Sequence, residues 1–498
     1  MPSQTYQQFI ERVREINLLS SIESTLEWDQ ETYMPARGAS TRAAQLAVIA
    51  GVAHEKLLNP ELGRLLEKVE QEADPDPIVA ANVREFRRVY DRKVKLPTRL
   101  VQEIASASAL AKEAWAKARR ESRFAHFAPH LERLLDLKRH VAEHIGYQTE
   151  PYDALMDEFE PGARAAEIHN VFEGLKAELV PLVQAIATAP RQPDTTVLQR
   201  PCPQPAQAEL GRRIVAAMGF DFDAGRIDVT VHPFCSGLSP EDVRLTNRYD
   251  EHYLPMSLFG IMHEAGHGLY EQGLLAEHAH TPMGMTVSLG IHESQSRMWE
   301  NLVGRSRAFW LHWFPALQAA FPSLADVKLD DWYFAINAVR PSFIRVEADE
   351  VTYNLHIMLR FDLERQMIAG RLRVQDVPQA WNDTFRQLLG ITPPDDARGC
   401  LQDIHWSMGV FGYFPTYALG NLYAAQFFEA ARHALPELEA QLTRGELRPL
   451  REWLRENIHR HGQRYRAGEL VQRVTGQPLS HRSFVEYLVR KYKPLYGL

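Results

Sequence analysis

The sequence predicts a mainly α protein with one small β-sheet. Two observations support this fold class: apolar residues follow helical spacing over most of the chain, and strand-like alternation is confined to a short stretch near its middle. At 498 residues, with 45% hydrophobic and 24% charged residues, the chain has the composition of a globular protein with a large buried core.

The first part of the chain is predicted to be a series of amphipathic helices. Apolar residues recur there at intervals of three and four, which places them on one helix face. Proline-containing breaks at 34–38, 74–77 and 96–97 separate the helices. The predicted helices cover residues 5–20, 41–73, 76–92, 98–120, 127–146 and 165–188.

A proline-rich segment at 189–205 follows the last of these helices. The segment is too short, and too rich in interspersed apolar residues, to be a disordered linker. We expect it to connect two lobes of the protein.

The strand signals lie just after this connector. Residues 226–232 and 242–246 alternate between apolar and polar side chains, which is typical of half-buried strands. The residues between them, 235–241, contain Gly and Pro and favour a hairpin. Residues 285–289 form a possible third strand, and helices resume after residue 290.

The most informative local pattern is His263-Glu264-Ala265-Gly266-His267, in a segment predicted to be a buried helix. Histidines four positions apart share a helix face and fit two positions of a tetrahedral zinc. Glu264, displaced by one residue, is placed to act as general base on the water that the metal activates. The alternative is a chance pair of hydrogen-bonded histidines. The helical context favours metal, as does the small Gly266, which we expect to leave room near the metal.

A third ligand is needed, and spacing narrows the choice. The longer His-Glu-x-x-His-x-x-Gly-x-x-His pattern is rejected because the chain has Tyr270 and Gly273 at the required positions. His278 and His280 are possible ligands in a polar loop. Glu293, on a second predicted helix, is the better candidate because the two helices would present three ligands and leave a fourth position for water. A salt-bridged surface carboxylate is the alternative interpretation of Glu293.

Composition excludes several functional classes. A net charge of −8 without a basic stripe argues against nucleic acid as a partner. The chain has no stretch of about 18 apolar residues, so no membrane span is expected, and no secretory signal is visible at its start. The three cysteines, Cys202, Cys235 and Cys400, are widely spaced and are interpreted as free thiols in a reducing compartment, which favours a cytoplasmic location.

Several segments together resemble the carboxypeptidase Taq family of metallocarboxypeptidases. The match begins with His263–His267 followed by Ile291-His292-Glu293-Ser294-Gln295. It continues through His232-Pro233-Phe234, Asp242-Val243-Arg244-Leu245-Thr246, Ile344-Arg345-Val346-Glu347-Ala348-Asp349, Gly399–Trp406, and Leu26-Glu27-Trp28-Asp29 with Met34-Pro35. These motifs span nearly the full length of the chain in order.

The resemblance implies one helical, cleft-shaped metallopeptidase domain over 1–498, with two lobes around a cleft and a small sheet beside the metal-site helix. It implies that the enzyme releases single residues from peptide carboxyl ends, with broad specificity expected. It also implies His263, His267 and Glu293 as ligands of one divalent metal, Glu264 as base, and a homodimer. Zinc is the expected metal, although cobalt and manganese suit the same ligands.

Peptide hydrolysis also needs a donor that stabilises the oxyanion. Helical peptidases similar to this family use a downstream histidine and tyrosine, which indicates His405 and Tyr413, with Tyr417 as a second, substrate-binding candidate. Core packing with a satisfied hydroxyl is the alternative for either tyrosine.

Recognition of a free carboxyl end calls for an arginine, whose planar fork binds carboxylate in a bidentate way. Arg345 is the first candidate and Arg244 the second. The alternative for Arg345 is an ion pair with Asp349, four residues later on a helix. Asp349 and Asp403 are further candidates for orienting histidines.

Three functions stay open from the residues alone. They are a carboxypeptidase, an endopeptidase or dipeptide-releasing enzyme on the same site, and a non-catalytic peptide-binding scaffold. The intact Glu264 argues against the scaffold.

Overall fold

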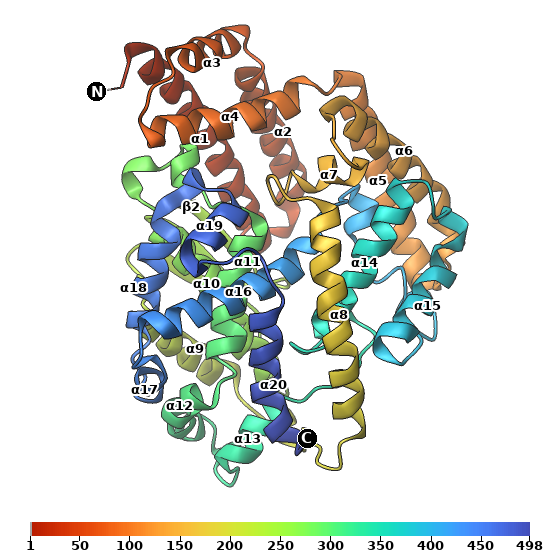
Figure 1. The fold of residues 1–498 in the computed structure, drawn as a ribbon, viewed down its shortest axis with the longest axis vertical. Helices are drawn as coiled ribbons and strands as arrows, with labels where there is room; N and C mark the ends of the chain where they lie inside the picture. Colours follow the sequence, from red (N-terminus) through yellow and green to blue (C-terminus); the bar gives the residue numbers. More distant parts are fainter. Residues whose placement is uncertain (1) are drawn as a thin grey trace.

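The computed structural model describes residues 2–498 and confirms the predicted mainly α fold with a small sheet (Figure 1). The first eight helices are α1 Gln4–Thr32, α2 Ala39–Leu57, α3 Pro60–Glu72, α4 Pro77–Val94, α5 Thr98–Glu121, α6 Ala128–Ile145, α7 Pro151–Met156 and α8 Ala165–Thr188. The middle helices are α9 Gln204–Met218, α10 Leu254–Gly273, α11 Leu289–Arg297, α12 Arg307–Ala320 and α13 Leu329–Ile336. The last are α14 Tyr353–Ile368, α15 Val377–Leu389, α16 Pro415–Ala434, α17 Leu438–Thr443, α18 Arg448–Asn457, α19 Ala467–Thr475 and α20 Arg482–Tyr496.

The helices predicted at 76–92, 98–120, 127–146 and 165–188 match α4, α5, α6 and α8 to within two residues, but the first two predictions do not match. The helix predicted at 5–20 is too short, because α1 continues to Thr32. The predicted helix 41–73 is two helices, α2 and α3, which meet at Asn59 and Pro60. Pro60 cannot continue the preceding helix but suits the first position of a new one. The Asn59 side chain caps α3 by accepting a hydrogen bond from the backbone N–H of Glu61 at 2.8 Å.

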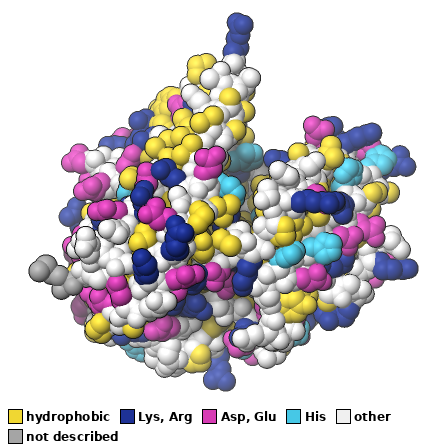
Figure 2. Space-filling view, turned by 90° about the horizontal axis from the view of Figure 1, so that it is seen from above, with side chains coloured by type: hydrophobic (Ala, Val, Ile, Leu, Met, Phe, Trp, Pro, Cys, Tyr) yellow, Lys and Arg dark blue, Asp and Glu magenta, His cyan; other side chains and the backbone are white. Residues whose placement is uncertain are grey.

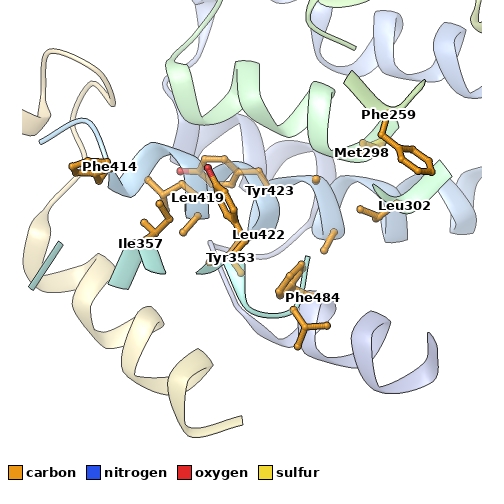
Figure 3. Packing of buried hydrophobic residues seen from close by; sticks show 14 of the residues in the cluster. Phe259, Met298, Leu302, Tyr353, Ile357, Phe414, Leu419, Leu422, Tyr423 and Phe484 are labelled. Carbon is orange, nitrogen blue, oxygen red and sulfur yellow. The ribbon is translucent and has the colours of Figure 1, made fainter. Parts of the chain in front are cut away.

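The hydrophobic core has two parts. A small cluster joins α1, α3 and α4, with Phe9, Val13 and Leu66 at its centre. The main cluster runs from α5 to the end of the chain. Figure 3 shows how α16 crosses it: Leu419, Leu422 and Tyr423 lie beside Tyr353 and Ile357 of α14, while Phe259, Met298 and Leu302 pack at the other end. The long helix α8 packs beside α20 at the C-terminus (Figure 1).

The sheet has three strands in the order β1-β3-β2. β1 Gly225–Val229 pairs in parallel with β3 Asp242–Asn247, and β2 Cys235–Ser239 pairs antiparallel with β3. The predicted hairpin between 226–232 and 242–246 is therefore wrong. Alternation identified both strands, but the intervening residues form a strand of their own that takes one edge of β3, so β1 occupies the other edge in the parallel sense.

Residues 285–289 are not a strand, which corrects the second expectation about the sheet. Their backbone groups bond to side chains and to carbonyls outside any strand, such as the Phe159 carbonyl, which accepts from the Leu289 N–H at 3.0 Å. Val287 donates its N–H to the Tyr270 hydroxyl at 3.1 Å, and the Thr286 carbonyl accepts from the Gln463 amide at 3.0 Å. Polar backbone groups need partners, but a ladder is only one way to supply them.

The connector 189–205 contains buried residues that belong to the main cluster, namely Val197, Leu198 and Cys202. The Cys202 N–H donates to the Glu251 carbonyl at 2.7 Å. A division into two lobes at this segment stays a prediction. Seen from above, the surface is hollowed between a taller and a lower part, and charges of both signs are mixed over this face (Figure 2). Among residues 2–498, none of the helices combines the length and apolar character needed to cross a membrane.

Candidate metal centre

Two helices that cross at close range carry the predicted metal ligands. α10 holds His263, Glu264 and His267, and α11 holds Glu293. α11 begins at Leu289, where the Ser288 hydroxyl caps it by accepting from the Ile291 N–H at 3.1 Å. His263, His267 and Glu293 therefore all lie on helices, as the sequence predicts.

Two glycines let α11 lie tightly between its neighbours. A Cβ at Gly266 of α10 would lie 2.6 Å from the Gln295 carbonyl oxygen and the Ser296 Cα. A Cβ at Gly420 of α16 would lie 2.4 Å from Cγ of Glu293. Gly266 was expected to leave room near the metal; instead, its missing side chain makes room for the backbone of α11.

The three predicted ligands meet at one point. His263 Nε2 lies 3.2 Å from His267 Nε2 and 3.6 Å from Glu293 Oε2, and His267 Nε2 lies 3.5 Å from the same oxygen. Ligand atoms about 2.1 Å from a tetrahedral zinc are separated by roughly 3.4 Å, so the spacing fits such an ion. Among residues 2–498 this is the one group of His, Cys, Asp or Glu side chains arranged to hold a metal, and neither His278 nor His280 belongs to it.

Each histidine ligand has a partner at its outer nitrogen. His263 Nδ1 donates to Glu300 Oε2 at 2.9 Å. Glu300 lies on a π-helix, Met298–Val303, which continues α11 (η6). Although burial opposes ionisation, Arg297, His263 and Arg305 lower the pKa of Glu300 to about 2. His267 Nδ1 instead faces His292.

Sequence reasoning missed Glu300. The position one turn after Glu293 is Arg297, which is not a carboxylate. A position seven residues after Glu293 also lies on the same helix face, and this spacing was the signal available in the sequence.

Glu293 is buried and bonded on both oxygens. Oε1 accepts from Arg297 Nε at 2.7 Å, while Oε2 faces the two histidines. Burial alone would raise the pKa of Glu293, but the charges of Arg297 and His263 hold it well below its ordinary value. The alternative of a surface salt bridge is therefore wrong on one point: the salt bridge to Arg297 exists, but it is buried and orients Glu293 toward the histidines.

Glu264 is a buried carboxyl group beside this cluster. Burial raises its pKa to about 7, and Glu293 and Glu300 add to the effect while His263 and His292 oppose it. A carboxyl group with such a pKa exchanges protons readily near neutral pH.

The residues predicted for the oxyanion and the substrate form a second cluster. His405 starts a 3-10 turn, His405–Met408, and Tyr413 and Tyr417 flank the start of α16. Ring centroids of His405 and Tyr413 are 5.5 Å apart, and those of Tyr413 and Tyr417 are 5.3 Å apart. Burial raises the pKa of Tyr413, and the nearby Glu293 carboxylate raises it further, so this cluster adjoins the metal group.

Arg345 lies in the same cluster and is almost fully buried. Its Nε and Nη2 donate to Asp403 Oδ1 at 3.1 and 2.9 Å, and Nη1 donates to the Tyr353 hydroxyl at 2.9 Å. Its guanidinium carbon lies 4.9 Å from the ring centre of Tyr417. Asp403 also accepts from Arg360 Nε at 2.7 Å.

The expected roles of the two aspartates are wrong. Asp349 does not pair with Arg345; it accepts from the N–H groups of Val351 and Thr352, both at 3.0 Å, just before α14. Asp403 binds two arginines and no histidine. The structure thus replaces the local Arg345–Asp349 pair with a long-range one.

Tyr353, which the sequence did not single out, connects the two clusters. Its ring stacks under Arg297, whose guanidinium carbon is 4.5 Å from the ring centre, and its hydroxyl accepts from Arg345. Arg244, the second carboxylate candidate, lies elsewhere. It pairs with Asp242 at 2.8 Å and stacks on Trp28 of α1 at 4.2 Å.

A buried carboxylate anchors the loop that carries His405 and Tyr413. Glu364 of α14 accepts from Trp406 Nε1 at 2.8 Å and from the Gly412 N–H at 3.0 Å, next to His405 and Tyr413 in sequence. The Tyr152 hydroxyl donates to it at 2.7 Å. Both ends of the loop are therefore tied to one side chain.

Comparisons with known proteins agree on one family. A model described as carboxypeptidase Taq (M32) metallopeptidase matches residues 8–492. The chain is similar to thermostable carboxypeptidase 1 of Thermus thermophilus, at 46% identity over 509 residues and 100% of both chains, and to carboxypeptidase 1 of Bacillus subtilis, at 38% over 501 residues and 100% of both. An M32 carboxypeptidase structure from Deinococcus radiodurans R1 matches with a TM-score of 0.97 at 41% identity, covering 100% of each chain.

Proposed function

The chain belongs to the carboxypeptidase Taq (M32) metallopeptidase family, and from that premise we propose that it releases single C-terminal residues from peptides, with broad specificity and Glu264 as general base. It is a metallocarboxypeptidase, a peptide hydrolase. The observation that carries the proposal is the convergence of His263, His267 and Glu293 beside the buried Glu264.

The proposed metal is zinc, one ion per chain. The two imidazole nitrogens and one carboxylate oxygen suit zinc, and cobalt and manganese accept the same donors. When bound, the metal supplies Lewis acidity toward the scissile carbonyl and the attacking water. Metal analysis of the purified protein tests the identity of the ion.

Glu264 is proposed to take a proton from the attacking water and to deliver it to the leaving amine. Both transfers need a carboxyl group whose pKa is near the working pH, and burial brings the pKa of Glu264 to about 7. A cation held by the neighbouring ligands favours the ionised form, which is the form that accepts the proton.

His405 and Tyr413 are proposed to donate hydrogen bonds to the oxyanion. Burial, together with Arg345 and Arg360, lowers the pKa of His405 to about 4 against the opposing charge of Asp403, so the imidazole is neutral at pH 7. Burial keeps the Tyr413 hydroxyl protonated, since it raises the pKa of that group. Both groups are therefore neutral donors, and Tyr417 is proposed to contact the substrate.

The proposed site for the terminal carboxylate of the substrate is Arg345. Asp403 accepts hydrogen bonds from both Arg345 and Arg360, so two guanidinium groups share one carboxylate and one positive charge is left over. A substrate carboxylate beside Tyr417 would balance that charge. Arg244 is the alternative, but its pairing with Asp242 and its position against α1 favour it less.

A time course followed by mass spectrometry tests the proposal. One peptide is offered with a free and with an amidated carboxyl end, with added zinc or cobalt. Loss of one residue at a time from the free end alone is the expected result. Internal cleavage or release of dipeptides contradicts the exopeptidase proposal, and no cleavage by metal-loaded protein favours a binding scaffold.

A homodimer and a cytoplasmic location are part of the same proposal. The dimer rests on the family resemblance, and sedimentation equilibrium of the purified chain tests it. The location rests on the cysteines: Cys202, Cys235 and Cys400 are all free thiols, and Cys202 and Cys400 are buried.

A further inference from the structure

The two histidine ligands are supported in different ways. His263 donates directly to a carboxylate, Glu300. His267 presents the same nitrogen, Nδ1, to another imidazole, since it faces Nδ1 of His292 within hydrogen-bonding distance. His292 in turn contacts Glu271, with Nε2 and Oε1 2.8 Å apart. The three residues form a chain that runs from Glu271 through His292 to His267.

The direction of these hydrogen bonds follows from the chemistry of the groups. The carboxylate of Glu271 can only accept, so His292 Nε2 carries a proton and donates it. In the neutral imidazole this leaves Nδ1 of His292 as an acceptor. His267 must then donate from its own Nδ1, which leaves Nε2 unprotonated, with its lone pair free to bind a metal.

The surrounding structure holds this chain in place. Glu271 lies on α10 one turn after His267, and His292 lies on α11 next to Glu293, so both helices of the metal group take part. Gly237 of β2 leaves room for the carboxylate, because a Cβ there would lie 2.4 Å from Cδ of Glu271. The His292 ring also packs near Tyr270, with centroids 5.3 Å apart.

We propose that His292 and Glu271 are positioning residues for the metal: together they fix the tautomer of His267 that binds it. The proposal rests on the metal site of the proposed function, but not on any step of peptide cleavage. Neighbours of this kind orient ligands and raise their basicity, and losing one costs about 10–100-fold in metal affinity.

Two amide substitutions of His292 separate its two bonds. The amide of H292N reaches only the position of Nδ1, so its oxygen can still accept from His267. The amide of H292Q reaches only the position of Nε2, so it can keep Glu271 as a partner but offers His267 no acceptor. Competition with a chromogenic chelator measures the zinc dissociation constant of each full-length variant. We expect H292Q to bind zinc about 10–100-fold more weakly than wild type, and H292N to stay within about threefold of it.

Glu271→Gln and Glu277→Gln form a matched pair with the same change of charge. Glu277 is an exposed carboxylate beside His278, outside the metal group. Glu271→Gln should weaken zinc binding by about tenfold or more, because a Gln amide can donate to His292 Nε2 and no longer forces the His292 tautomer that accepts from His267. Glu277→Gln should leave zinc binding unchanged. Turnover of each variant should follow its zinc occupancy.

Two results overturn the proposal. One is unchanged zinc affinity in H292Q. The other is an equal loss in H292N and H292Q, accompanied by a lower melting temperature of the metal-free proteins, which would assign His292 a packing role. Zinc affinity is measured without peptide, so the two proposals are tested independently. A negative result for His292 and Glu271 would not contradict the proposed peptide cleavage, and a negative cleavage assay would not contradict their role in zinc binding.

Discussion

The site has two sides that are built in different ways. The metal side consists of His263, Glu264, His267 and Glu293 on α10 and α11, with Glu300 behind them. The arginine side consists of Arg345, Arg360, Asp403, His405, Tyr413 and Tyr417, which come from loops, from the start of α16 and, for Arg360, from the middle of α14. The metal side depends on spacing along helices, whereas the arginine side depends on contacts between distant segments.

The two sides also differ in charge. Carboxylates surround the histidines on the metal side, which favours a bound cation. On the arginine side two guanidinium groups share Asp403, which favours a bound anion. A peptide with a free carboxyl end offers both partners, a carbonyl for the metal and a carboxylate for the arginine. Tyr353 contacts both sides, through Arg297 and Arg345.

Removing the base on the metal side is expected to have the largest effect. Glu264→Gln should lower kcat by about 10³-fold or more, because it removes the proton acceptor for the attacking water. Zinc content should stay near that of the wild type, since Glu264 is not one of the three candidate ligands. Steady-state kinetics and metal analysis measure both; activity near the wild-type level would remove Glu264 from the mechanism.

Arg345→Ala tests the arginine side and should reduce activity mainly on substrates with a free carboxyl end. We expect kcat/KM for peptides with a free carboxyl end to fall by about 10²-fold, because one partner of a charge-assisted pair is lost. Arg244→Ala is the matched control and should have little effect. An equal loss on every substrate, together with a lower unfolding free energy, would assign Arg345 a structural role through its bonds to Asp403.

Tyr413→Phe and Tyr417→Phe compare two neighbouring hydroxyls on the arginine side. Loss of an oxyanion donor typically lowers kcat by about 10²–10³-fold. We expect the Tyr413 variant to approach this loss and the Tyr417 variant to change KM more than kcat. If the two variants give the reverse pattern in steady-state kinetics, Tyr417 is the donor.

Gly266→Ala tests how closely α10 and α11 must approach. The added methyl would meet the backbone of Gln295 and Ser296, which cannot move without shifting α11. We expect the unfolding free energy to fall by about 1–3 kcal/mol in urea titrations, with weaker zinc binding. Gly468→Ala is a suitable control, because nothing lies within 4 Å of the added Cβ.

The smallest expected effect is a pH dependence of stability that comes from Glu364, which anchors the loop carrying His405 and Tyr413. Burial raises the pKa of Glu364 to about 7, above the value of about 4.3 in an unfolded chain. Between these values the folded state holds the extra proton, so this contribution to stability is complete below about pH 4.3 and is lost as pH rises through about 7.

Urea unfolding of the metal-free protein at pH 6 and pH 8 measures this contribution. From pH 6 to pH 8, the unfolding free energy of the wild type should fall by about 1 kcal/mol more than that of the Glu364→Gln variant. Glu160, whose pKa burial also raises to about 7, is present in both proteins and cancels from the difference. If the unfolding free energies of the two proteins fall by the same amount, Glu364 is ionised at both pH values and is stabilised in that form by its three hydrogen-bond donors.

The sequence by itself determined most of the helices and the three candidate metal ligands. Helical spacing is local, because residues four apart share a helix face independently of how the helix packs. His263 and His267 must therefore lie on the same face of their helix. The break between α2 and α3 was also readable in principle, from Asn59 and Pro60, although it was not predicted.

Only the tertiary structure decided which residues surround those ligands and which strands pair. Glu300 reaches His263 across 37 positions, and Asp403 reaches Arg345 across 58 and Arg360 across 43. No periodicity relates such pairs, because the packing of whole helices sets their distances. The parallel pairing of β1 with β3 was undetermined for the same reason: alternation shows which residues face the core, and the neighbour is set by how the chain turns in space.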